Sequence, residues 1–219
     1  MVLEELEHLS EEIKRCTACN LYNSRTQAVP GTYGEVHGLC FIGEAPGFYE
    51  DKQGLPFVGR SGKLLDNMLR EIGLSRGQVS ILNVVKCRPT NEKGENRTPT
   101  TQELTFCGSK WLTQQLNLLS PRLIVSLGGI ALKFFFPNLS VTKVAGKLLD
   151  LPSKQKLFAT YHPAYILRNF SLLERYEEHF LAIKEYYNKL NIEETMDINK
   201  KEKTKMQKKP RQRSLTDFF

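Results

Sequence analysis

Four of the five cysteines lie within one domain-sized stretch of the chain and could act together. Cys16 and Cys19 form a C-x-x-C pair, and Cys87 and Cys107 follow at wide spacing. Four thiolates of this kind can enclose a tetrahedral Zn²⁺ ion or a [4Fe-4S] cluster, because both take soft, anionic sulfur ligands. The spacing alone does not choose between them. The fifth cysteine, Cys40, lies in the apolar run LCFIGE and is expected to be simply buried.

Polar residues end or interrupt the apolar runs of the sequence. The turn GEAPG, with Glu44 as its carboxylate, exposes backbone N–H groups, although it could also be a plain strand-to-loop turn. Asn83 interrupts the run ILNVV and needs hydrogen-bond partners from the protein or from a ligand. His162 precedes Pro163, which is expected to exclude a helix-like backbone bond. That histidine is either structural or part of a binding site.

A glycine-bounded loop, GLPFVGRSG, places Phe57 just ahead of a predicted helix. An exposed phenylalanine at this position could stack on a base. The start of the helix, near Ser61 and Gly62, could hold a phosphate because its N–H groups are free.

The elements that must position these residues alternate along the chain. Buried strands are predicted at 39–44, 80–86, 123–128 and 157–162, and helices at 3–15, 61–73, 100–119 and 171–190. The alternation predicts a three-layer α/β/α fold around a central parallel four-stranded sheet. Open parallel sheets bind ligands at the carboxyl ends of their strands, so one crevice is expected to collect the polar residues.

Charge and hydropathy place this domain in a cytoplasmic setting. No apolar run is long enough to cross a membrane and the N-terminus is acidic, so no membrane contact or secretory signal is expected. The formal charge is +7, and residues 200–213 carry eight lysines or arginines and one glutamate. We expect a domain at 1–191 and a disordered basic tail at 192–219. The nearly neutral body would then attract phosphates only locally, through Arg60, Lys63, Lys86, Arg88 and Arg168.

Four segments in order, GEAPGFYED, LPFVGRSG, NVVKCRP and HPAYILRN, with the cysteines between them, resemble the family 4 uracil-DNA glycosylases, the thermostable [4Fe-4S] type. The resemblance covers about residues 10–185. It implies a uracil-DNA glycosylase-like fold and a DNA-repair enzyme, expected as a monomer, that acts on uracil-containing DNA, single- or double-stranded. The enzyme flips the base, hydrolyses the N-glycosidic bond, releases uracil and leaves an abasic site without strand cleavage. It also implies that the four cysteines hold a [4Fe-4S] cluster rather than zinc, with a structural role.

The resemblance assigns roles to residues of the expected uracil site. Phe57 matches the residue that stacks on the flipped uracil, and Asn83 matches the amide that reads its pairing edge. His162 matches the catalytic histidine that hydrogen-bonds the O2 atom of the base as negative charge develops there. Gly43 and Ala45 belong to the turn that binds uracil.

The catalytic carboxylate is less directly assigned. Glu44 is expected to orient water or to stabilise the cationic sugar. The family 1 enzymes carry an aspartate where this chain has Ala45, and a tyrosine that bars thymine where it has Gly47. Glu50 and Asp51, later in the same loop, are further candidates for water activation.

The segment after the histidine resembles the loop that the family inserts into the duplex. Ile166 and Leu167 would form an apolar wedge, while Arg168 and Ser61 would contact the DNA backbone. Alternatively, Ile166 and Leu167 begin a helix that faces the core.

The C-terminus carries a separate pattern. Gln212, Leu215, Phe218 and Phe219 match the spacing of peptides that dock on DNA sliding clamps, which predicts a clamp partner. The alternative is a basic DNA tether with incidental aromatic residues.

Two other functions stay open at this point. One is a glycosylase with a wider base range that includes deaminated purines, because Gly47 leaves the pocket wall open. The other is a non-catalytic iron–sulfur module that binds DNA and recruits the clamp.

Overall fold

A central sheet organises the chain, which we describe from a computed structural model at residues 1–153 and 155–207, with side chains up to residue 192. The strands are β1 (Leu39–Gly43), β2 (Ser80–Asn83), β3 (Leu123–Leu127), β4 (Lys147–Asp150) and β5 (Lys156–Thr160), and their spatial order is β2-β1-β3-β5-β4. β1, β2, β3 and β5 run parallel, as predicted, and β4 pairs antiparallel with β5. The fifth strand corrects the expected count. Its sequence KLLD is half exposed at the sheet edge and lacks the continuous apolar run of a buried parallel strand.

The helices that the sequence predicts are all present. They are α1 (Val2–Arg15), α3 (Arg60–Glu71), α4 (Thr101–Cys107), α5 (Thr113–Leu119) and α9 (Leu173–Gln207), with a π-helical turn, η3 (Gly108–Leu112), joining α4 to α5. Three short helices are not predicted: α2 (Phe48–Gln53), α6 (Gly129–Phe135) and α7 (Val141–Val144). A fourth, α8 (Pro163–Arg168), corresponds to the helix that the sequence offers only as an alternative to a DNA-inserting loop. Single 3-10 turns complete the fold at η1 (Asn20–Asn23), η2 (Arg76–Gln78) and η4 (Phe170–Leu172). The short helices lack room for the apolar periodicity that reveals a longer one.

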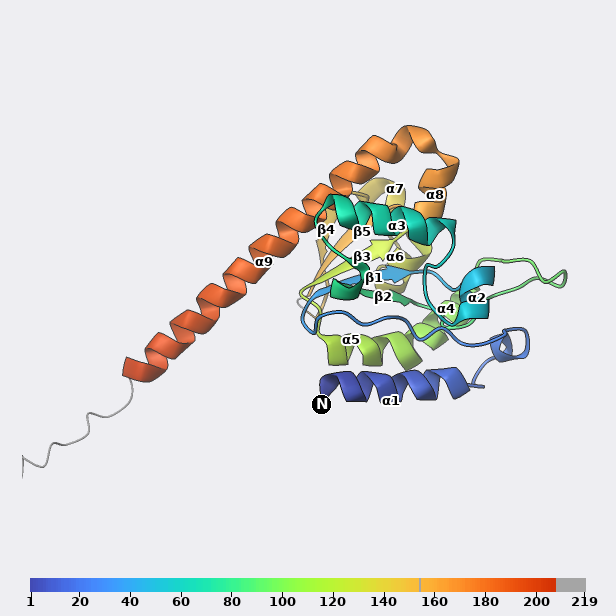
Figure 1. Cartoon of the computed structure of the whole chain (residues 1–219), viewed down its shortest axis with the longest axis horizontal. Coiled ribbons are helices and arrows are strands. Elements are labelled where there is room, and N and C mark those ends of the chain that lie inside the picture. The colour runs from blue at the N-terminus through green and yellow to red at the C-terminus, as the bar shows by residue number, and fades with distance from the viewer. Residues whose placement is uncertain (154, 208–219) are drawn as a thin grey trace, which may run out of the picture.

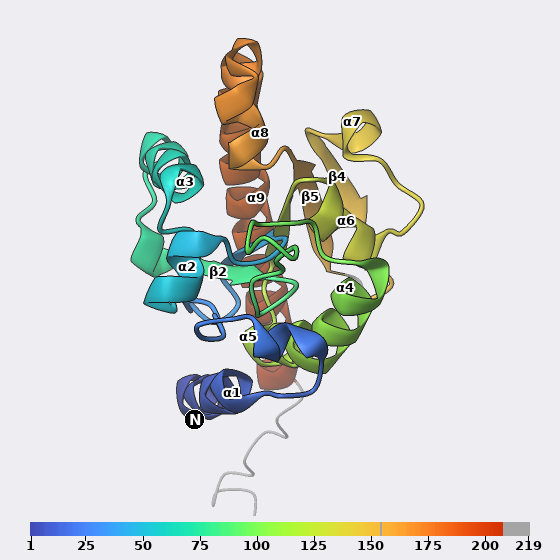
Figure 2. The same cartoon turned by 90° about the vertical axis from the view of Figure 1, so that its right-hand side faces the viewer.

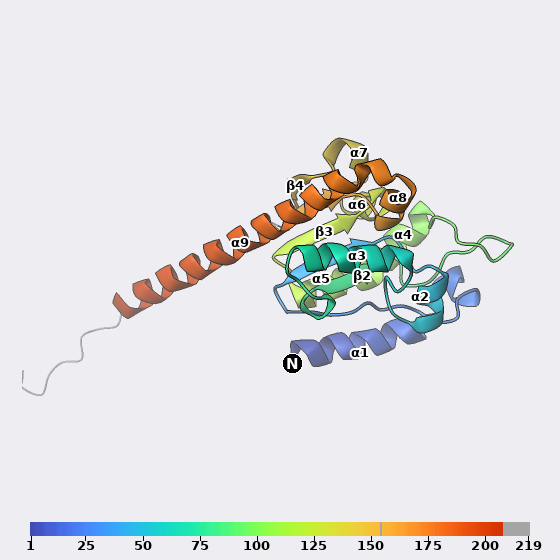
Figure 3. The same cartoon turned by 45° about the horizontal axis from the view of Figure 1, so that its top comes forward.

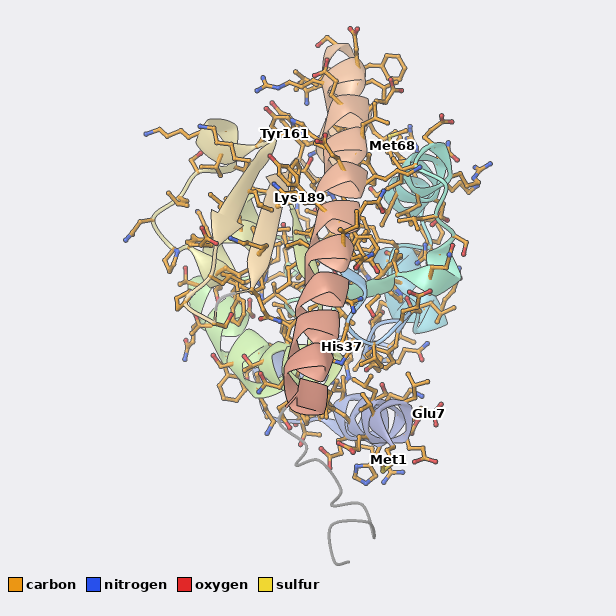
Figure 4. All side chains as sticks on the ribbon, turned by 90° about the vertical axis from the view of Figure 1, so that its left-hand side faces the viewer. Met1, Glu7, His37, Met68, Tyr161 and Lys189 are labelled. Carbon is orange, nitrogen blue, oxygen red and sulfur yellow. The ribbon has the colours of Figure 1, made fainter. Side chains whose placement is uncertain are left out.

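Helices cover both faces of the sheet, which gives the three predicted layers (Figure 1, Figure 3). On one face, α3 and α9 pack through a cluster that includes Phe41, Leu69 and Phe180. On the other face, α5 and α6 pack on residues such as Ile42, and α1 packs against α5. In Figure 4, α9 runs between α3, marked by Met68, and the region of β5, marked by Tyr161.

Helix α9 is longer than the sequence predicts. We expect it to end near 190, followed by a disordered tail from 192, whereas in the structure the helix continues to Gln207. The rest of the predicted tail, 208–219, lies outside the described residues. Residues 191–207 are rich in glutamate and lysine, which have a high helix propensity and extend a helix without an apolar stripe. None of the described helices has both the length and the apolar character needed for a membrane crossing. The clamp-motif residues Gln212, Leu215, Phe218 and Phe219 lie outside the described residues.

Candidate active site and cysteine cluster

A cleft of about 490 Å³ opens beside the carboxyl ends of β1, β2 and β5. This end of the sheet, with α2 and α8, lies on the right of Figure 1 and faces the viewer in Figure 2. The cleft brings together most of the residues that the sequence singles out. Its lining includes Glu44, Ala45, Gly47, Glu50, Phe57, Ser61, Asn83, His162 and Arg168.

Gly43 lies beneath this lining at the end of β1. A Cβ atom there would come within 2.4 Å of Asn83 Oδ1 and 2.6 Å of Phe57 Cζ. The missing side chain therefore lets the amide and the aromatic ring meet at the floor of the cleft. Its contribution to a uracil site is the space it leaves.

Asn83 is the last residue of β2 and is 2% exposed. Its Oδ1 atom has no hydrogen-bond partner. A buried amide oxygen without a partner costs free energy, and such groups are rare in folded proteins unless a ligand or water completes them. Because Asn83 lines a cleft, its unpaired oxygen favours a ligand over a structural amide network.

Phe57 lines the cleft but is only 6% exposed, so the expected exposed ring is corrected to a buried one. Its ring centroid lies 5.7 Å from that of His162, with an interplanar angle of 30°. The backbone at Phe57 has φ 51°, an uncommon conformation for a side chain of this size. Gly62 permits it, because a Cβ there would lie 1.6 Å from Phe57 O, and Arg76 Nη1 donates to the same oxygen at 3.2 Å.

His162 is the N-cap of α8, and its Nδ1 atom accepts a hydrogen bond from the Ala164 N–H at 3.1 Å. The expectation that the proline excludes such a bond is therefore wrong. Pro163 occupies the first helical position, where no N–H is needed, and the ring bonds one residue further on. Burial, and then the charge of Arg168, lower the pKa of His162 to about 4. The imidazole is thus neutral at pH 7, with its proton on Nε2 as a donor.

The three candidate carboxylates differ in what already binds them. Glu50 accepts three backbone N–H bonds, from Val58 at 2.9 Å, Gly59 at 3.0 Å and Gly47 at 3.1 Å. It thereby ties the GEAPG turn to the loop that carries Phe57.

Asp51 is 2% exposed, and both of its oxygens accept the Thr26 N–H at 2.9 and 3.0 Å. Glu44 has no side-chain partner among the described residues, and burial raises its pKa. Of the three, Glu44 is thus the carboxylate that the protein does not already bond, whereas Glu50 and Asp51 hold loops in place.

Gly47 is explained by the Glu50 contacts. A Cβ at Gly47 would lie 2.8 Å from Glu50 Oε2, so a side chain there would disturb the bridge. Gly47 lines the cleft without adding a side chain to it.

The residues expected to contact DNA do not all lie at the cleft. Ser61 and Arg168 line the cleft. Ile166 is fully buried in the core beneath α8, so its assignment as a DNA wedge is corrected in favour of the core-facing alternative. Leu167 is half buried and stays a candidate.

The four cysteines of the predicted cluster come from separate elements on the α1 and α5 side of the sheet. Cys16 and Cys19 flank the break between α1 and η1, Cys87 follows β2, and Cys107 ends α4. All are free of disulfides. Burial raises the pKa of Cys87, and the negative charges of the nearby Cys19 and Cys16 add to the rise.

Hydrogen bonds to sulfur surround this group. Arg25 Nη1 donates to Cys87 Sγ at 2.9 Å, and the Lys86 N–H donates to Cys107 Sγ at 3.3 Å. Among the described residues, no three histidine, cysteine, aspartate or glutamate side chains converge closely enough to hold one metal ion. Cys40, as expected, is buried, and burial raises its pKa to about 12.

Lys86 is a residue whose place the sequence does not reveal. Expected on a DNA-binding surface, it is instead 1% exposed, and its Nζ donates to Asn83 O at 2.6 Å. Burial lowers its pKa to about 8. Its position directly before Cys87 is the one signal in the sequence that links it to the cysteine group.

A neutral imidazole, an unpaired amide and an aromatic ring at the strand ends suit an enzyme that binds a planar heterocycle. Comparison with known families agrees, because residues 30–190 match the uracil DNA glycosylase superfamily. The predicted fold class is confirmed by this match.

Curated relatives narrow the assignment. The type-4 uracil-DNA glycosylase of Thermotoga maritima is 47% identical over 170 residues, which cover 77% of this chain and 86% of the relative. That of Sulfurisphaera tokodaii is 45% identical over 192 residues (84% and 85%), and that of Archaeoglobus fulgidus is 42% identical over 196 residues (85% and 96%). The chain belongs to the type-4 uracil-DNA glycosylases, which confirms the resemblance seen in the sequence.

Proposed function

We propose that this chain hydrolyses the N-glycosidic bond of deoxyuridine in DNA, releasing uracil and leaving an abasic site. Family membership supports the reaction. The observation that carries the site assignment is the buried amide of the cleft residue Asn83, whose oxygen has no partner. A base inside a duplex cannot reach this floor, so the reaction requires the uracil to be flipped out of its stack.

Recognition of uracil follows from the donor and acceptor pattern of the amide. Asn83 Oδ1 accepts the N3–H of uracil, and its amide N–H donates to O4. Cytosine offers an acceptor and an amino group at these positions, which would leave the amide unpaired and the base rejected. Phe57 supplies the face on which the flipped base stacks.

His162 supports departure of the base. Its Nε2–H donates to O2 of uracil, where negative charge develops as the glycosidic bond breaks. A neutral, fixed donor stabilises that charge mainly in the transition state and needs no proton transfer. The Ala164 N–H on Nδ1 holds the ring in the required tautomer.

Glu44 completes the reaction as the carboxylate that orients the attacking water and stabilises the cationic sugar. Its lack of protein partners supports this role. Ala45, in the neighbouring position, contributes no carboxylate.

The four cysteines fit a [4Fe-4S] cluster. All four thiols are free and can supply the four sulfur ligands of such a cluster. Two of them, Cys87 and Cys107, also receive N–H bonds, from Arg25 and Lys86, of the kind that stabilises thiolate ligands. When bound, the cluster supplies a cross-link between α1, the segment after β2, and α4.

The test is a glycosylase assay on an oligonucleotide with one uracil, with thymine, hypoxanthine and undamaged DNA as controls and alkali to reveal abasic sites. Release confined to uracil supports the proposal, and release of hypoxanthine would favour the wider base range. Asn83→Ala should abolish release while the visible absorbance of the cluster persists. Unchanged release by Asn83→Ala would overturn the site assignment. If the wild-type protein releases no base from any of these substrates, the result would favour a non-catalytic DNA-binding module.

We also propose that the C-terminal residues Gln212, Leu215, Phe218 and Phe219 bind a DNA sliding clamp. The sequence pattern is the support. Clamp binding by the full chain, compared with a Phe218→Ala, Phe219→Ala double variant, tests it. Equal binding by both proteins would leave the tail as a DNA tether.

A further inference from the structure

Two exposed aromatic side chains stand side by side at the cleft, and uracil binding does not account for them. Phe48 is 43% exposed and Tyr49 is 59% exposed. Both open α2 and both line the cleft. A single exposed aromatic residue is ordinary, but an adjacent pair at the edge of an active site marks a binding surface.

The two rings are held rather than loose. Their centroids lie 5.4 Å apart in an edge-to-face arrangement at 86°. Tyr49 Cδ2 lies 3.7 Å from the position that a Cβ on Gly59 would occupy, so the tyrosine rests on the loop ahead of α3. The bonds from Val58 and Gly59 to Glu50, in the same helix, fix α2 to that loop.

Positive charge lies beside Phe48. Lys52 Nζ lies 4.6 Å from the Phe48 ring centroid, and Arg88 Cζ lies 5.1 Å from it. No cation contacts the Tyr49 ring among the described residues, so Tyr49 is the ring left for a base. Arg60 and Arg168, which also line the cleft, can attract phosphates on either side of the flipped nucleotide.

We propose that Tyr49, supported by Phe48, stacks on the base next to the flipped uracil when the DNA is single-stranded. The inference rests on the proposed function and names the strand form that the site favours. In a single strand, a neighbouring base is free to leave its stack and meet an aromatic ring. In a duplex the same base stays paired and stacked, so Tyr49 has no base face to contact.

The experiment compares kcat/KM on a single-stranded oligonucleotide containing one uracil with kcat/KM on the same strand paired opposite guanine. Tyr49→Ala should lower the single-strand value about tenfold, as loss of one base–aromatic stack does, and should lower the duplex value at least fivefold less. Tyr49→Phe should keep the wild-type ratio of single-strand to duplex kcat/KM. Tyr49→Leu should behave like Tyr49→Ala, because leucine keeps apolar area but has no ring on which a base can stack. Leu181→Ala on α9, with the same 59% exposure, is the matched control away from the cleft.

A second arm removes the partner base. An abasic spacer is placed on the 5′ or the 3′ side of uracil in a single strand. On one of the two sides, the spacer should lower kcat/KM of the wild type about tenfold. Tyr49→Ala should be insensitive to both spacers, because the stack it would lose is already absent. Affinity of the same oligonucleotides, measured by fluorescence anisotropy, should follow the same pattern.

Three results would overturn the stacking role. Equal losses on single and double strands would indicate a backbone contact, and no loss at all would leave the pair for a protein partner. A Tyr49→Ala protein that still loses affinity with a spacer would place the stack elsewhere. Failure of the proposed function is distinct, because the wild type would then release no uracil from either strand form, while the anisotropy arm still decides the role of Tyr49.

Discussion

Polar groups at the floor of the cleft lack protein partners, whereas those in the loops around it are hydrogen-bonded. On the floor, Asn83 Oδ1 and the Glu44 carboxylate have no protein partner. In the loops, Glu50 accepts three backbone N–H bonds, and both oxygens of Asp51 accept the N–H of Thr26. Unpaired buried polar groups cost stability, and at the cleft a substrate can complete them. Changes at the floor should therefore lower kcat, whereas changes to Glu50 and Asp51, which hold the loops, should lower the free energy of unfolding.

The largest effect is expected at His162. Replacing it by asparagine keeps an N-cap for α8 but removes the Nε2–H donor. We expect kcat on uracil-containing DNA to fall about 10²–10³-fold, as for loss of one donor to a developing negative charge. The melting temperature should change little.

The control for this change is His162→Ala, which also removes the cap. It should lose the same rate and, in addition, about 1 kcal/mol of stability. Wild-type kcat in the asparagine variant would show that the histidine only caps the helix.

The cysteine group should give the largest effect on stability. Cys107→Ala removes one proposed ligand, so the visible absorbance of the cluster should be lost. The melting temperature should fall by about 10 °C, or roughly 3 kcal/mol in a domain of this size. Cys40→Ala is the matched buried control and should keep the absorbance. If Cys107→Ala retained full absorbance and iron content, the proposed ligand set would be wrong.

The two glutamates of one segment allow the comparison to be tested directly. Glu50→Gln replaces an acceptor of three N–H bonds by a group with one acceptor oxygen, and should destabilise the protein by about 1–3 kcal/mol. Glu44→Gln removes an unpaired, half-buried carboxylate and should leave stability unchanged or slightly raised. Urea unfolding measures both changes. If Glu44→Gln destabilised the protein more than Glu50→Gln, the proposed difference between the floor and the loops would be wrong.

Activity at low pH should sharpen the same division. Burial raises the pKa of Glu44 above its ordinary value, whereas that of His162 is lowered to about 4. As the pH falls, Glu44 therefore gains its proton first, and kcat should decrease with an acid limb above pH 4.5. Glu44→Gln should have a lower kcat without that limb. Persistence of the limb in this variant would assign it to another group.

The stability of the protein should follow the histidines instead. His162 and His179 both have folded-state pKa values lowered to about 4 by burial, against 6.5 when unfolded. The unfolded chain then binds more protons between these values, so stability is fully present above pH 6.5 and declines as the pH falls toward 4. Replacing His179 by glutamine should make the unfolding free energy less dependent on pH in this window. An unchanged slope would show that His179 does not contribute.

Much of this arrangement could be predicted because local patterns carry it. Apolar runs revealed the four parallel strands, and their carboxyl ends correctly collected Glu44, Asn83 and His162. The strand β4 and the helix α2 could not be predicted, and α8 stayed one of two alternatives, because elements of four to six residues are too short for a periodic signal. Only the packing of α8 shows that Ile166 belongs to the core and that His162 caps the helix.

The sequence by itself determined the alternating α/β order, the family, and the residue types available for chemistry, because these depend on periodicity and on motif order. Only the tertiary structure decided which of those residues are bonded within the protein and which are left unpaired. Whether a carboxylate is free or bonded, as with Glu44 and Glu50, depends on backbone N–H groups from distant loops. Whether a lysine faces solvent or lies buried against Asn83 O, as Lys86 does, depends on packing between layers. Local spacing contains no record of such contacts, because they form only when separate segments meet.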